Sequence, residues 1–160
     1  MLEVGSTIPD VTLKQMTESG PKDVSMSEYT RGRKVLIFAL PGPFTPTCSE
    51  SHVPSYIVRE EDLRARGVEA IACISTADFF VMDAWGKHLG VGNRIDMLAD
   101  GNSEFTRAAG MLIDLSEAGL GERSQRYAMI VDDGKVTHIE VESNPGKADV
   151  SGAEHMLRQL

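Results

Sequence analysis

The hydrophobic positions of this chain fall into short continuous apolar runs, separated by segments with helical spacing. Residues 34–40 (KVLIFAL) and 68–75 (VEAIACIS) are apolar runs, which predict two strands buried on both faces. Residues 47–67 and 78–90 repeat apolar positions every three to four residues, which predicts two helices. This order of strand, helix, strand and helix predicts a parallel βαβ unit.

The two predicted helices carry their own start and stop signals. Gly67 is expected to end the first helix, and Pro54 is expected to bend it because a proline ring clashes with the preceding turn. Asp78 or Thr76 is expected to cap the second helix, and Gly90 to end it.

The second half of the chain has shorter predicted elements. Residues 127–131 and 136–142 are joined by Asp132-Asp133-Gly134-Lys135, and this Asp-Gly turn predicts a β-hairpin. The first 30 residues are expected to form an edge strand or a hairpin before the core. The remaining expected elements are a strand over residues 95–100, a helix over 103–110 and a closing helix over about 150–159.

Together these elements predict an α/β fold with a central mixed β-sheet flanked by helices and an N-terminal strand or hairpin extension. No internal repeat, low-complexity tract or linker divides residues 1–160, so one domain is expected. With 160 residues and 41% hydrophobic side chains, the chain is long enough to build one core.

The charge of the chain limits its expected partners. Its 16 Lys and Arg residues stand against 24 Asp and Glu residues, and the net charge of −8 would repel a phosphate backbone. No apolar run approaches the roughly 20 residues of a membrane span, and Glu3 lies where a signal peptide would be basic. We therefore expect a cytoplasmic protein with no nucleic-acid or membrane partner.

The segment PGPFTPTCSE follows the first predicted strand, at the edge of the sheet where α/β proteins place their chemistry. The helix begins either with Thr45 as N-cap and Pro46 in the first position, or with Thr47 as N-cap and Glu50 in a capping box. In both registers Cys48 lies in the first turn, where free N–H groups and the helix dipole favour a thiolate. Cys48 is therefore a candidate nucleophile, and a buried packing role is the alternative.

Pro41, Thr45 and Cys48 form the pattern PxxxTxxC, which resembles the active-site signature of the peroxiredoxins. The string PGPFTPTCSESHVP is similar to that of type II, or peroxiredoxin 5-like, members. The similarity continues through GVEAIACIS, DFFVMDAW, MLADGNSEFTRAAG and SQRYAMIVDDGKV. The resemblance implies a thioredoxin-like fold and a thiol-dependent peroxidase that reduces hydrogen peroxide and organic hydroperoxides.

The resemblance also implies roles for four residues. Cys48 would attack the peroxide and become a sulfenic acid. Thr45 would hydrogen-bond to the peroxide and to the sulfur, and Pro41 would shield the sulfur from water. The family's catalytic arginine precedes a strand with an aromatic residue and a methionine, which is the place of Arg126 in RYAMIV, with Arg123 as the alternative. Arg126 would favour the thiolate and bind the developing oxyanion.

Cys73 lies in the middle of a predicted strand, and we expect it to pack in the core rather than to resolve a sulfenic acid. Some type II members carry a further cysteine near the C-terminus, whereas KADVSGAEHML has none. An external thiol is therefore expected to complete the cycle. Glutathione, alone or through glutaredoxin, is favoured, and thioredoxin is the alternative. The resemblance also implies a homodimer.

The four histidines, His52, His88, His138 and His155, have no HxH or HExxH spacing, and no metal site is expected. His52 lies on the same helical face as Cys48, where a cationic imidazole would assist the thiolate, but an exposed histidine is the preferred interpretation. No GxGxxG or P-loop string occurs, so no nucleotide cofactor is expected, and neither is flavin or haem.

Two other functions stay open at this point. A cysteine hydrolase would use Cys48 with His138 and Asp132 of the predicted hairpin. A non-enzymatic redox sensor or interaction domain would keep the fold and only report oxidation of the thiol. Consumption of peroxide with a thiol reductant separates the three functions, because only the peroxidase turns over.

Overall fold

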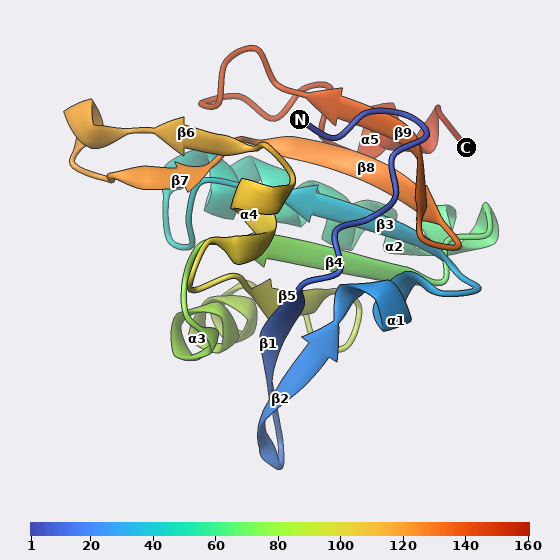
Figure 1. The fold of residues 1–160 in the computed structure, drawn as a ribbon, viewed down its shortest axis with the longest axis horizontal. Coiled ribbons are helices and arrows are strands. Elements are labelled where there is room, and N and C mark those ends of the chain that lie inside the picture. Colours follow the sequence, from blue (N-terminus) through green and yellow to red (C-terminus); the bar gives the residue numbers. More distant parts are fainter.

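A seven-stranded mixed β-sheet forms the centre of the protein, which the computed structural model describes over all 160 residues (Figure 1). Its strands, from one edge to the other, are β2 (Gly20–Ser25), β1 (Thr12–Thr17), β5 (Asp96–Ala99), β4 (Ala70–Ser75), β3 (Lys34–Ala39), β8 (Tyr127–Asp132) and β9 (Lys135–Val141). β3, β4 and β5 are parallel, and the flanking strands pair antiparallel. The expected mixed sheet is confirmed, with the β1–β2 hairpin as its N-terminal extension.

Helices cover both faces of this sheet, and in Figure 1 α4 lies in front of it and α2 behind it. The face that carries the two cysteines is covered by α2 (Val53–Ala65), α3 (Phe79–Leu89) and α5 (Ala153–Leu157). The opposite face is covered by α1 (Met26–Thr30) and α4 (Glu104–Ala108). Burial of both faces explains why the central strands are continuous apolar runs. No helix combines the length and apolar composition that crossing a bilayer requires.

The local signals operate as expected in α3 and in the β8–β9 hairpin, and both elements are confirmed. Asp78 caps α3 by accepting a hydrogen bond from the Val81 N–H at 2.9 Å, and Gly90 ends it with a φ of 69°. In the turn between β8 and β9, Asp133 and Gly134 have φ values of 47° and 79°. These are the left-handed values that an Asp-Gly turn tolerates.

The closing helix is shorter than expected, because α5 begins at Ala153 rather than at about residue 150. Ser151 is held outside the helix, since its N–H and its hydroxyl both donate to Glu142 Oε2, at 2.8 and 2.6 Å. Residues 142–152 therefore form a loop between β9 and α5, which we call the C-terminal loop.

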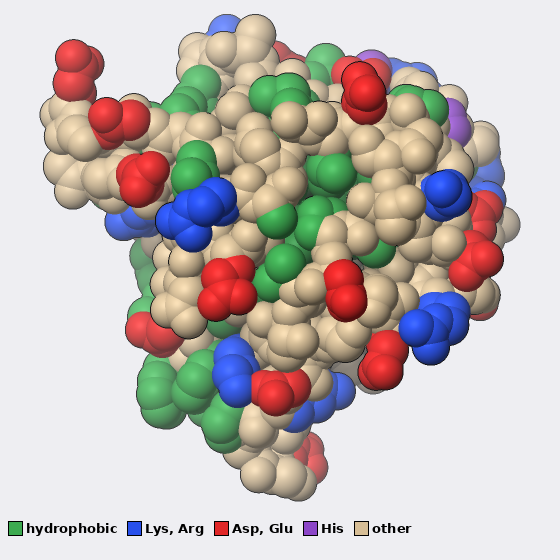
Figure 2. Space-filling view, viewed as in Figure 1, with side chains coloured by type: hydrophobic (Ala, Val, Ile, Leu, Met, Phe, Trp, Pro, Cys, Tyr) green, Lys and Arg blue, Asp and Glu red, His purple; other side chains and the backbone are tan.

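A two-stranded arm, which the sequence pattern did not predict, projects from the body of the protein (Figure 1). It consists of β6 (Leu112–Asp114), the 3-10 turn η2 (Ser116–Ala118) and β7 (Glu122–Ser124). Strands of three residues are too short to show a period. Figure 2 shows acidic side chains on the arm, whose Asp114, Glu117 and Glu122 are exposed.

Candidate active site at Cys48

Cys48 opens a π-helical turn, η1 (Cys48–His52), which connects the loop after β3 to helix α2. The turn closes with a hydrogen bond from the Val53 N–H to the Cys48 carbonyl, five residues back. Pro54, the next residue, has no N–H to donate to a regular α-helical bond. The disturbance expected at Pro54 therefore takes the form of a wide turn that contains the cysteine. Such turns are frequent at functional sites.

The helical segment starts in the first of the two expected registers. Pro46 is the first helical residue, and the Ser49 N–H donates to the Thr45 carbonyl at 3.0 Å. The capping box of the second register is not formed, because the Thr47 hydroxyl donates instead to the Gly146 carbonyl of the C-terminal loop at 2.7 Å. The cysteine lies in the first turn, as both registers predicted.

The guanidinium of Arg126 is the polar group in contact with the sulfur. Its Nη2 donates to Cys48 Sγ at 3.1 Å, and its Nε donates to the Pro145 carbonyl at 2.9 Å. Arg126 is only 2% exposed, Cys48 is fully buried, and no carboxylate forms an ion pair with this arginine. An unpaired positive charge in this environment stabilises negative charge on the sulfur. The structure thus brings together two of the expected site residues.

His52 is buried, so the expectation of an exposed histidine is wrong. Its Nδ1 accepts a hydrogen bond from Arg126 Nη1 at 2.9 Å, and its Nε2 lies 3.0 Å from the Ser151 carbonyl. Burial, together with the charge of Arg126, lowers the pKa of His52 from 6.5 to about 3. The imidazole is therefore neutral near pH 7 and not cationic. The helical pattern could not reveal that the C-terminal loop covers this side chain.

Burial of a neutral His52 predicts acid-dependent stability. Below pH 6.5 the unfolded chain protonates this histidine while the native protein does not, and this difference persists down to the native pKa of about 3. We expect its contribution to the free energy of unfolding to fall by about 1.4 kcal/mol per pH unit over this window. Denaturant unfolding measured between about pH 7 and about pH 5 tests this. His52→Asn should have a shallower slope, whereas His88→Asn, which changes an exposed histidine, should keep it.

A cavity of about 240 Å³ leads to this arginine. Pro41, Thr45 and Arg126 line it, and Leu115 and Leu120 of the arm add apolar walls. Three of the four expected site residues therefore face one cavity, and the fourth, the cysteine, lies beneath the guanidinium that lines it.

Thr45 and Arg123 both bind backbone carbonyls of the loop after β3. The Thr45 hydroxyl donates to the Gly42 carbonyl at 2.6 Å, and its expected hydrogen bond to the sulfur is absent. Arg123 Nη1 donates to the Pro41 carbonyl at 3.1 Å. A Cβ at Gly42 would lie 2.3 Å from that nitrogen, so the glycine allows this approach. Arg126, and not the alternative Arg123, is the arginine at the sulfur.

Cys73 is buried in β4, in the same hydrophobic core as Cys48, and both cysteines are free. Burial, reinforced by the nearby charge of Cys48, raises the pKa of the Cys73 thiol well above its usual range. Cys73 therefore stays protonated near neutral pH, as its expected packing role requires.

The cysteine hydrolase alternative is wrong. Asp132 pairs with Lys34 at the amino end of β3, whereas Cys48 follows the carboxyl end of that strand. At about 3.3 Å per residue, the six residues of β3 separate these ends by about 16 Å. His138 contacts Thr137 rather than the cysteine, so no triad forms.

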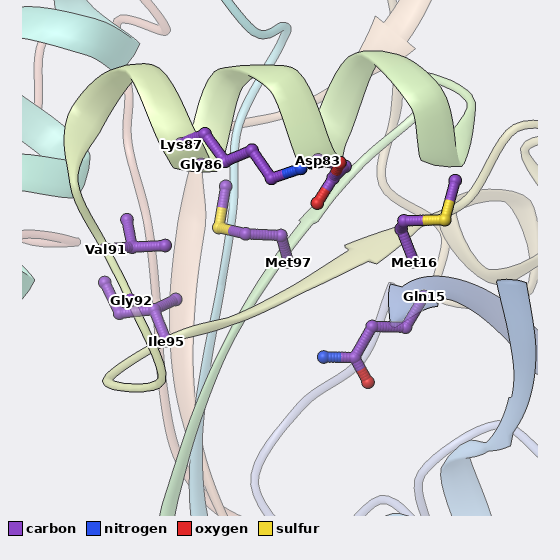
Figure 3. A pocket seen from close by; sticks show the side chains of 9 residues that line it. All are labelled: Gln15, Met16, Asp83, Gly86, Lys87, Val91, Gly92, Ile95 and Met97. Carbon is purple, nitrogen blue, oxygen red and sulfur yellow. Dashed lines mark ion pairs between the residues drawn. The ribbon is translucent and has the colours of Figure 1, made fainter. Parts of the chain in front are cut away.

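A second cavity of about 260 Å³ lies between α3 and strands β1 and β5 (Figure 3). A Cβ at Gly86 would lie 3.0 Å from Met97 Cγ, so the glycine lets α3 approach β5 closely. Lys87 and Asp83 form an ion pair of 3.0 Å at this cavity. Its lining contains no cysteine or histidine, its two charged groups are paired with each other, and it shares no residue with the first cavity.

Comparisons with known proteins cover nearly the whole chain. Residues 3–157 match the model of the Redoxin family. Peroxiredoxin-2E, chloroplastic, of Arabidopsis thaliana is 45% identical over 163 residues, which cover 99% of this chain and 69% of that protein. Peroxiredoxin-2D of the same plant is 42% identical over 99% of this chain and 98% of its own length. The crystal structure of reduced Prx3 in complex with H2O2 from Vibrio vulnificus is 47% identical, with a TM-score of 0.94 over 99% of both chains.

A thioredoxin-like sheet that buries a cysteine against an arginine beyond the carboxyl end of a central strand defines a thiol-dependent redox protein. The chain belongs to the Redoxin family, and within it to the type II peroxiredoxins. It is a thiol peroxidase that reduces peroxides. This result removes the alternative of a non-enzymatic redox sensor.

Proposed function

We propose that Cys48 is the peroxidatic residue of this peroxidase. Its thiolate attacks one oxygen of the hydroperoxide and the O–O bond breaks. The sulfur becomes a sulfenic acid, and the other oxygen takes up a proton and leaves as water or an alcohol. The observation that carries the proposal is the 3.1 Å contact between Arg126 Nη2 and Cys48 Sγ beside the cavity. The relative from Vibrio vulnificus that is described in complex with H2O2 supports peroxide as the ligand of this cavity.

The other residues of the site have distinct roles in this proposal. Arg126 stabilises the thiolate and the negative charge that develops on the leaving oxygen. Thr45, whose hydroxyl proton is engaged by the Gly42 carbonyl, presents hydroxyl lone pairs that can accept the peroxide O–H. Pro41 is buried at the wall of the cavity and limits access of water to the sulfur.

An external thiol completes the proposed one-cysteine cycle. Cys73 is a buried, protonated thiol, and the C-terminal region contains no cysteine that could condense with the sulfenic acid. A first glutathione condenses with Cys48–SOH to a mixed disulfide and water, and a second releases glutathione disulfide and the free Cys48 thiol. Glutaredoxin could deliver the second thiol, and thioredoxin is the alternative reductant. Two free cysteines fit a reducing compartment, and we propose the cytoplasm.

We also propose that the protein acts as a homodimer. Phe44, Phe80 and Val81 are 54%, 66% and 36% exposed on or beside α3. Phe44 lies against this helix, with its ring centroid 5.7 Å from that of His88. Figure 2 shows hydrophobic side chains gathered at the end of the protein that α3 occupies. A second copy over this surface would remove it from water, which is the usual fate of a clustered apolar surface.

Mass spectrometry of a peroxide-treated protein tests the proposed cycle. We expect one equivalent of peroxide followed by one equivalent of glutathione to leave a single glutathione adduct on Cys48. In a separate assay, excess peroxide and excess glutathione should give sustained peroxide turnover. Cys73→Ser should give the same adduct and retain most of the turnover. Its buried hydroxyl should lower the free energy of unfolding by about 1 to 3 kcal/mol.

Three outcomes would contradict parts of this cycle. A Cys48–Cys73 disulfide in high yield would show that Cys73 resolves the sulfenic acid. Turnover with thioredoxin but no glutathione adduct would replace the reductant and leave the peroxidatic role of Cys48 intact. An adduct on Cys73 instead of Cys48 would overturn the assignment of the nucleophile.

A further inference from the structure

Three hydrogen bonds hold the guanidinium of Arg126, and only one of them is made to the proposed nucleophile, Cys48. Nε donates to the Pro145 carbonyl at 2.9 Å, Nη1 to His52 Nδ1 at 2.9 Å, and Nη2 to Cys48 Sγ at 3.1 Å. Because the guanidinium is planar and rigid, binding at two of its nitrogens sets the direction of the third. His52 therefore helps to determine where the positive charge lies relative to the sulfur.

The acceptor on His52 exists in one form of the imidazole only. Nδ1 can accept a hydrogen bond when the ring is neutral and carries its proton on Nε2. The Ser151 carbonyl, 3.0 Å from Nε2, selects this tautomer by accepting the Nε2–H. The Tyr56 hydroxyl donates to the same carbonyl at 2.6 Å, and burial raises the pKa of Tyr56, so it remains a donor.

The backbone of Ser151 is itself held in place by Glu142. Glu142 Oε2 accepts both the N–H and the hydroxyl of Ser151, and the Glu142 N–H donates to the Arg126 carbonyl at 2.9 Å. The hydrogen bonds therefore form a closed ring. Arg126 contacts His52, and His52 contacts Ser151. Ser151 contacts Glu142, which contacts the backbone of Arg126. This closed network orients the imidazole, and the imidazole orients the guanidinium.

A neutral acceptor differs from a carboxylate in its effect on the guanidinium charge. A carboxylate at the place of His52 Nδ1 would pair with Arg126 and offset the field at the sulfur. Imidazole and the Pro145 carbonyl hold the same nitrogens without adding a charge. Cys48 and His52 also begin and end the same π-helical turn, so one local structure positions both groups.

We propose that His52 is a positioning residue of the peroxidase reaction, whose neutral imidazole aims Arg126 Nη2 at Cys48 Sγ without offsetting the guanidinium charge. The inference rests on the roles proposed above for Cys48 and Arg126. It assigns the function to one ring nitrogen, because only Nδ1 contacts the arginine while Nε2 contacts the backbone.

Two amide substitutions at His52 distinguish the role of Nδ1 from the role of Nε2. The Oδ1 atom of an asparagine can take the place of Nδ1, so His52→Asn keeps an acceptor for Arg126 and loses the contact with Ser151. The Nε2 atom of a glutamine can take the place of His52 Nε2, so His52→Gln keeps the contact with Ser151 and loses the acceptor for Arg126. Both variants replace the ring by an uncharged amide of similar polarity.

The readouts are the rate of Cys48 alkylation by iodoacetamide, which reports the thiolate, and the second-order rate constant for hydrogen peroxide. We expect both rates to fall about tenfold or more in His52→Gln, because a hydrogen bond from a charged group is lost. His52→Asn, which keeps the acceptor for Arg126 but loses the contact with Ser151, should lose less of both rates than His52→Gln. Melting temperatures of both variants report folding independently.

If His52 had only a structural role, the rates of His52→Gln would not fall more than those of His52→Asn. Equal losses of both rates in the two variants, a larger loss in His52→Asn, or wild-type rates in both would each overturn the proposal. Failure of the proposed function is distinguishable from these results, because it would show as peroxide turnover that survives in Cys48→Ser. A His52→Gln variant that melts like wild type but reacts slowly would establish the positioning role without ambiguity from misfolding.

Discussion

Cys48→Ser is expected to abolish peroxide turnover while the protein remains folded. A serine hydroxyl stays protonated near neutral pH and is a poor nucleophile toward peroxide. It can still accept the hydrogen bond that Arg126 Nη2 gives to Cys48 Sγ, so the buried guanidinium keeps a partner. The measurement is peroxide consumption with glutathione as reductant, together with a thermal melt.

Cys73→Ser is the matched control for this variant, because it changes the other buried cysteine to the same residue. Turnover above about a tenth of the wild-type rate in Cys48→Ser would remove Cys48 from the peroxidatic role. Turnover lost in Cys73→Ser, with a melt like that of the wild type, would show that the second cysteine takes part in the cycle.

Arg126→Ala is expected to slow the reaction with hydrogen peroxide by about 30-fold to 1,000-fold. The estimate follows from the loss of about 2 to 4 kcal/mol of charge stabilisation in the transition state. The variant also leaves His52 Nδ1 and the Pro145 carbonyl without a donor, so the free energy of unfolding should fall by about 1 to 3 kcal/mol. Stopped-flow rates well below the melting temperature separate the two effects.

Arg123→Ala provides the comparison for this prediction. Both side chains bind backbone carbonyls next to the cavity, but Arg123 donates to Pro41 and Leu120 and not to the sulfur. We therefore expect a smaller loss of rate in Arg123→Ala. A larger loss than in Arg126→Ala would mean that the contact between Arg126 and Cys48 is not the one that drives the reaction.

The order of the elements was predictable because strands that are buried on both faces have apolar side chains at nearly every position. β3 and β4 are covered on both faces, and each was visible as an apolar run, while Asp78 and Gly90 marked the ends of α3. The arm of β6 and β7 was missed because its strands have three residues each. Such short strands are held by their pairing with each other and leave no periodic pattern.

The place of Cys48 in the first helical turn could also be inferred from the sequence, since the residues that form the turn lie within a few positions of it. Arg126 is a different case. Its residue type and surroundings alone fit a solvated arginine at the start of a strand, and only the resemblance to a family pointed to the site. The 3.1 Å contact with the sulfur then distinguished it from Arg123.

The environment of His52 was decided by the tertiary structure alone. Its two hydrogen-bond partners lie 74 and 99 residues away in the chain, and no local pattern relates such distant positions. The same holds for Thr47, whose hydroxyl forms no cap because the carbonyl of Gly146, 99 residues away, lies within reach. Short-range spacing determines which residues share a helical turn. Which of them are buried, neutral or bonded depends on the segment that packs over the turn, and here that segment is the C-terminal loop.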